Sequence, residues 1–144
     1  MPATELLCQI MGINPDKLAR EEVIILEAEI FTRVCDELRE FIKDGYRNYF
    51  RIMKFNAEME CEMLEGNFLR CIINDILLTE EYTLSGIAYY TQSPEDVIYE
   101  ITVGNNNNPS MLLSRKIIEL HRSVRPTLYR EIIKKIAANF LSAA

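Results

Sequence analysis

Residues 83–117 read TLSGIAYYTQSPEDVIYEITVGNNNNPSMLLSRKI, and this segment holds the clearest helix signals in the chain. Thr83 is a good N-cap residue, so it predicts a short helix over Thr83–Tyr90. The Ser-Pro-Glu sequence that follows is a second start signal, and it predicts a helix over Pro94–Thr102 with Gly104 just past its end. The segment therefore predicts two short helices joined by a tight turn.

The signals around this pair predict further helices. An amphipathic pattern follows Gly66 and predicts a helix over Asn67–Leu78. After the asparagine loop, Pro109 is expected to open a helix over Ser110–Arg122, and Pro126 a last helix that reaches about Phe140. Two helices that cross closely need a small residue at the crossing. The residues expected in the shared core are Ala88, Ile98, Ile101 and Leu113.

The order of these features resembles the lambda-repressor/Cro-like family of helix-turn-helix domains over about 55 residues, from Gly66 to His121. The matching features are the pair Ile87-Ala88, the turn Thr91–Ser93, the aliphatic residues Ile98 and Ile101, Gly104, Pro109 and Leu113. The resemblance implies a five-helix domain that binds DNA and regulates transcription.

In that family the DNA groove is read from the start of the second helix of the pair and from one turn further on, and the polar loop holds phosphates. The resemblance therefore implies three groove-reading positions, Glu95, Asp96 and Glu100. The predicted phosphate contacts are the loop residues and two basic residues in the next helix: Asn105, Asn106, Asn107, Asn108, Arg115 and Lys116. A carboxylate accepts a hydrogen bond from cytosine N4, but it also repels phosphates.

The acidic groove-reading positions leave a second interpretation open. Glu95 and Asp96 also stabilise the positive end of a helix dipole without any DNA. The alternative function is a protein-interaction module, an adaptor or inhibitor, in which the same helices present an acidic face to a basic partner.

The first 65 residues predict a dimerisation segment ahead of the helix-turn-helix domain at 66–144. A short helix over Thr4–Met11 is followed by start signals at Asn14 and Pro15, which predict a long helix up to Gly45. It carries apolar residues at heptad spacing: Ile24, Ala28, Phe31, Cys35, Leu38 and Ile42. Such a stripe predicts either packing within the domain or a homodimer.

The stretch Met53–Met63 alternates apolar and polar residues without a break, which predicts an extended, β-type segment. Helix propensity points the other way, because Met, Glu and Ala favour helices. The overall fold class expected is thus mostly α, with five helices in the helix-turn-helix domain preceded by a long helix and this short extended segment.

The bulk composition, with 49% hydrophobic and 26% charged residues in 144, is typical of a globular protein. The net charge is −6, yet seven basic residues against two acidic ones follow Pro109. No apolar run is long enough to predict a membrane span. The N-terminal residues also lack the basic region followed by an apolar stretch that is typical of a secretory signal peptide, so we expect a cytoplasmic protein. Four widely spaced cysteines and one histidine, His121, predict no metal site, and no enzyme or cofactor is expected. We expect His121 on a helix surface.

Overall fold

A computed structural model describes residues 2–143 of the protein, and the side-chain surroundings of residues 7–14 and 16–139. The described residues form helices joined by turns and loops, without a strand, and the chain divides into two compact units. We call Met1–Phe41 with Thr127–Ala144 the terminal unit and Ile42–Pro126 the central unit. Across residues 2–143, no helix combines the length and the apolar character that crossing a bilayer requires.

The terminal unit contains α1 (Pro2–Met11), a short 3-10 turn (Pro15–Lys17), most of α2 (Arg20–Gly45) and nearly all of α8 (Pro126–Ala143). The long helix expected from Pro15 begins later, because Asn14 starts a 3-10 turn instead: its carbonyl accepts from the Lys17 N–H and its side chain from the Asp16 N–H. The Glu22 carboxylate then accepts from the Ala19 N–H, in the manner of a capping box at the start of α2.

The heptad stripe of α2 is covered only in part. Cys35 and Leu38 are buried in the chain itself, whereas Ile24 is 55% exposed. On the same helix, the Glu37 carboxylate accepts a hydrogen bond of 2.9 Å from Lys135 of α8, which ties α2 to α8. Part of the stripe therefore packs within the chain, and its first turns remain available for another surface.

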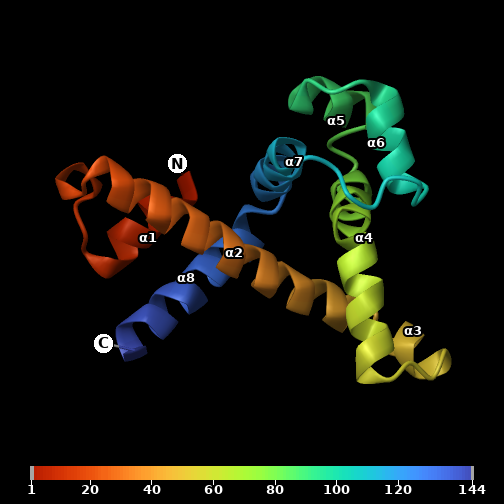
Figure 1. Ribbon diagram of the computed structural model, residues 1–144, viewed down its shortest axis with the longest axis horizontal. Coiled ribbons are helices and arrows are strands. Elements are labelled where there is room, and N and C mark those ends of the chain that lie inside the picture. The colour runs from red at the N-terminus through yellow and green to blue at the C-terminus, as the bar shows by residue number, and fades with distance from the viewer. Residues whose placement is uncertain (1, 144) are drawn as a thin grey trace. The chain divides into compact units, whose positions relative to one another are not determined.

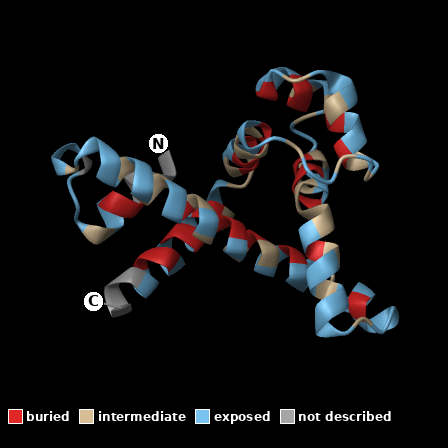
Figure 2. Cartoon of the chain, viewed as in Figure 1, coloured by how far each residue is buried: buried red, intermediate tan, exposed pale blue. Residues whose placement is uncertain are grey.

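The central unit contains α3 (Arg47–Ile52), α4 (Ala57–Leu78), α5 (Leu84–Thr91), α6 (Glu95–Thr102) and α7 (Met111–Val124) (Figure 1). α4 packs against α6 and α7, and α5 packs against the same two helices. Buried residues gather in the second half of α4, in α5 and in α7 (Figure 2). The predicted core residues Ala88, Ile98, Ile101 and Leu113 are all buried, between 0% and 8% exposed.

The extended segment predicted at Met53–Met63 is wrong, because Ala57–Met63 forms the first turns of α4. Asn56 caps this helix, and its side chain accepts a 2.8 Å hydrogen bond from the Met59 N–H. Acidic residues at the helix start stabilise the dipole, and Met, Glu and Ala have high helix propensity. Met59 is 47% exposed, so the alternating apolar residues do not share one buried face.

The start of a helix predicted at Asn67 corresponds to a kink inside α4. Asn67 has φ −126° and ψ 16°, outside the helical region, and its side chain donates a hydrogen bond to the Met63 carbonyl. The side chain thus satisfies a carbonyl near the break in the helical hydrogen bonding. The functional division of the chain at Gly66 stays a prediction.

Candidate functional site

The turn between α5 and α6 is defined by hydrogen bonds at both ends of α5. The Thr83 hydroxyl accepts from the Gly86 N–H at the start of the helix. At the other end, Gln92 is in the left-handed region with φ 55°, and the Ser93 N–H donates to the Ala88 carbonyl. This is the geometry of a Schellman motif, which ends a helix sharply. It lets α6 begin only a few residues later, at Glu95.

The exposed side of α6 carries the predicted groove-reading residues. Glu95, Asp96 and Glu100 are all exposed, and Tyr99 between them is 55% exposed. Ile98 and Ile101 face the opposite way, into the core. The helix therefore presents three carboxylates and a phenol ring to solvent.

The asparagine loop folds back on the end of α6. Gly104 has φ +81°, a conformation that glycine adopts without strain, and the Asn105 and Asn106 N–H groups both donate to the Glu100 carbonyl. Asn106 is half-buried, whereas Asn105, Asn107 and Asn108 are exposed. The structure thus brings the predicted loop residues to the C-terminal end of the predicted reading helix.

The two basic residues of α7 that were predicted to contact phosphates, Arg115 and Lys116, are both half-buried and have partners within the protein. Lys116 is half-buried, and its ammonium donates to the Thr91 carbonyl at 3.2 Å and to the Gln92 side chain at 3.5 Å. It therefore neutralises the negative end of the α5 dipole next to the turn. Arg115 is also half-buried and has a partner within the protein.

The structure adds Arg70, a basic residue outside the set that the sequence pattern predicts. It is exposed on α4, and its guanidinium Nη1 would lie 3.4 Å from a Cβ added at Gly104. Arg70 therefore lies at the C-terminal end of α6, while Lys116 lies at the turn before its first residue. Arg70 is the only basic residue between Lys54 and Arg115, but nothing in the sequence around it indicates that it reaches the end of α6.

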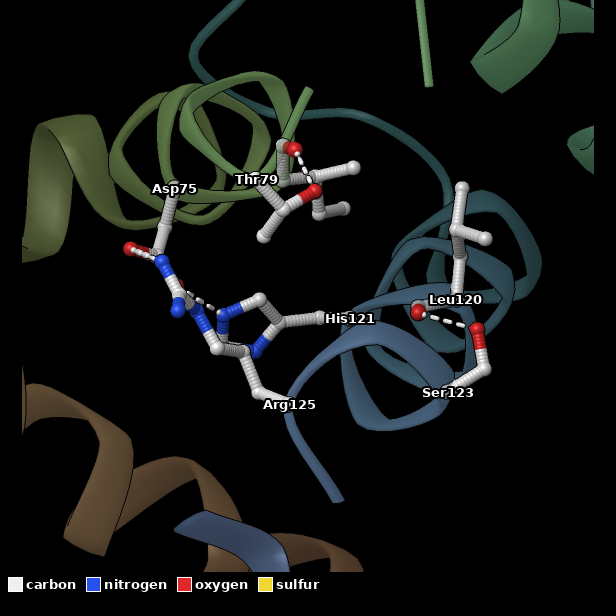
Figure 3. A network of polar contacts seen from close by, with 7 residues as sticks. Asp75, Thr79, Leu120, His121, Ser123 and Arg125 are labelled. Atoms are coloured by element: carbon white, nitrogen blue, oxygen red, sulfur yellow. Dashed lines mark hydrogen bonds and ion pairs between the residues drawn. The ribbon is translucent and has the colours of Figure 1, made fainter. Parts of the chain in front are cut away.

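A polar cluster of Asp75, His121 and Arg125 joins α4 to the end of α7 (Figure 3). The Asp75 carboxylate receives two bonds of 3.1 Å from Arg125 and lies 2.6 Å from His121 Nε2. The placement of His121 on a helix surface is wrong, since its side chain is fully buried. The sequence pattern around His121 is amphipathic, and it does not reveal a carboxylate partner that comes from another helix.

The protonation of this cluster follows from its surroundings. Burial lowers the pKa of His121 below 6.5, and this effect exceeds the opposite one from the neighbouring Asp75 carboxylate. Partial burial raises the pKa of Asp75, but the hydrogen bonds from Arg125 and His121 outweigh it and hold that pKa below 3.8. At neutral pH, therefore, an uncharged imidazole donates its Nε2–H to an ionised carboxylate. This bond fixes α7 on α4, the frame on which α5 and α6 rest.

The chain matches no family model, no curated protein and no solved structure. In the described part of the chain, no three His, Cys, Asp or Glu side chains gather in a way that could hold a metal ion.

Proposed function

We propose that this protein is a helix-turn-helix transcription regulator of the lambda-repressor/Cro-like kind that acts in the cytoplasm and binds DNA with α6. The observation that carries the proposal is the placement of α6: it is exposed along one side, with Lys116 near its start and Arg70 near its end. Cations at both ends of a reading helix suit the two phosphate strands that border a groove.

The other proposed DNA contacts follow from the hydrogen-bonding groups that the loop and α6 expose. The Asn105–Asn108 side chains supply amide donors for phosphate oxygens next to Arg70. Glu95 and Glu100 are suited to accept from cytosine N4 in the major groove. Their charges also oppose the phosphates, so DNA binding is expected to be weak in general and to gain from sites rich in correctly placed cytosines.

Arg70 provides a direct test of this assignment. Arg70→Ala is expected to weaken binding to mixed-sequence duplex DNA and to reduce the slope of log affinity against log salt by about one, since one phosphate contact is lost. Gel shifts and fluorescence anisotropy at several salt concentrations from low ionic strength upward measure both quantities. Lys17→Ala is the matched control, because it removes an equal charge from an exposed site in the terminal unit. Equal slopes for the two variants would contradict a phosphate contact at Arg70.

We also propose that the protein is a homodimer formed by residues before Gly66, because dimers of such domains bind paired half-sites on DNA. This part of the chain leaves several large apolar side chains exposed. They are Ile24, Ile25, Ile52, Met53 and Met59, with exposed fractions from 47% to 76%. The first two belong to the terminal unit and the other three to the central unit, and in each unit a partner surface would cover this apolar area.

Sedimentation equilibrium of the full chain is expected to give twice the mass of one chain at micromolar concentration. The double variant Ile24→Asp with Ile25→Asp is expected to give the mass of one chain, because two charges cannot be buried in an apolar interface without a large cost. Both side chains are more than half exposed, so the fold itself should tolerate the change. A wild-type protein that sediments as a monomer would refute the dimer.

A second candidate function is a protein-interaction module, and one observation favours it. Between Thr79 and Pro109 the chain has five acidic residues and no basic one. All five are exposed: Glu80, Glu81, Glu95, Asp96 and Glu100. A surface of this kind attracts a basic protein and accelerates its association at low salt.

A further inference from the structure

A hollow beside α5 has three tyrosines in its lining. Its lining includes Tyr82, Gly86, Tyr89, Tyr90, Gln92 and Ser93. The rings of Tyr82 and Tyr90 meet edge to face, with centroids 6.4 Å apart and an angle of 82° between their planes. Tyr89 also belongs to the lining and is 89% exposed, so its ring stands in water.

Gly86 helps to shape the hollow. A Cβ at this position would lie 3.3 Å from Cδ1 of the Tyr82 ring, so the absence of a side chain lets that ring pack directly on α5. The edge-to-face contact then holds the Tyr90 ring against it. The wall is thus partly preformed, and a ligand would have to order only the free ring of Tyr89.

The negative charges next to the hollow indicate which kind of ligand it would attract. Glu80 and Glu81 immediately precede Tyr82, and both are exposed. Among the side chains described, those of residues 7–14 and 16–139, none makes an ion pair with either carboxylate. Tyrosine faces attract cations through the ring quadrupole, and carboxylates nearby add a longer-range attraction. Bases also stack on tyrosine, but a nucleic acid would bring its phosphates against uncompensated carboxylates.

We propose that this tyrosine hollow binds an arginine or lysine side chain from a segment of a basic partner protein. The cation lies over the Tyr89 ring and the Tyr82–Tyr90 pair, and Glu80 and Glu81 attract the flanking basic residues. This inference deepens the second candidate function, and it does not depend on DNA binding. Failure of peptide binding is distinguishable from failure of DNA binding, because the peptide titration contains no DNA duplex.

The probe is a fluorescently labelled peptide of alternating arginine and glycine, and its binding to the full chain is measured by anisotropy. Wild type is expected to bind it, and a peptide with citrulline in place of arginine is expected not to bind. Tyr89→Ala is expected to weaken binding roughly 3- to 10-fold, as loss of a cation–π contact would. Tyr89→Phe keeps the ring and should retain most of the affinity. Tyr99→Ala is the matched control, since Tyr99 is an exposed tyrosine on α6 outside the hollow.

Three results would overturn the proposal. Equal peptide affinity for wild type and Tyr89→Ala would mean that the carboxylates attract the peptide without the rings, which leaves the second candidate function but removes the hollow. A Tyr89-dependent affinity for a labelled single-stranded oligonucleotide would assign the rings to bases. A change in sedimenting mass caused by Tyr89→Ala would assign the hollow to a second copy of this chain.

Discussion

Asp75→Ala is expected to lower the free energy of unfolding by about 1–3 kcal/mol, because it leaves the buried His121 N–H without its acceptor. The loss of the two bonds to Arg125 adds less, since that side chain is 39% exposed and solvent screens its charge. Urea unfolding at pH 7.5, followed by circular dichroism, measures the difference. Because Asp75 and His121 hold α4 and α7 together, the variant should also weaken whatever α5 and α6 bind.

Asp75→Asn is the matched control for this prediction. The asparagine side chain keeps an oxygen that can accept from His121, so its cost should be clearly smaller than that of alanine. An alanine variant as stable as wild type would show that this hydrogen bond does not support the central unit.

The same cluster predicts how stability changes with pH. The folded-state pKa of His121 is lowered, so the unfolded chain binds a proton first as the pH falls. The contribution of His121 to the free energy of unfolding is therefore expected to be constant above about pH 6.5. It should fall as the pH drops from 6.5 towards the lower pKa that His121 has in the folded protein. The lowered pKa of Asp75 adds a second loss below pH 3.8. His121→Gln should flatten the first decline, because no other histidine is present.

The sequence was informative where local signals agree with tertiary packing. Thr83 as an N-cap and the spacing of Ile98 and Ile101 predicted the helices α5 and α6 and their buried face. The alternation from Met53 to Met63 misled, because helix propensity and the Asn56 cap outweigh a period-two pattern that has no partner strand.

The features that the sequence could not reveal depend on contacts between distant residues. His121 is buried because Asp75, on another helix, satisfies its ring nitrogen. Arg70 reaches the end of α6 because α4 packs beside that helix. Neither contact leaves a periodic or spacing signal near the residue concerned.

The charges of α6 provide the second large expected effect. Glu95→Gln with Glu100→Gln keeps the size of both side chains and one acceptor oxygen on each, and it removes two exposed negative charges. If α6 lies in a DNA groove, non-specific affinity for duplex DNA should rise roughly 5- to 30-fold at low salt, since each exposed charge contributes about 0.5–1 kcal/mol. Glu21→Gln with Glu40→Gln is the matched control, because it removes the same charge from exposed positions on α2.

The measurement that tests the central claim most directly is the affinity of these two double variants and wild type for the same mixed-sequence duplex DNA at low ionic strength. DNA binding by α6 predicts that wild type binds, that the α6 variant binds several-fold more tightly, and that the α2 control binds like wild type. No detectable binding by wild type or by the α6 variant, or an equal gain for both double variants, would contradict it.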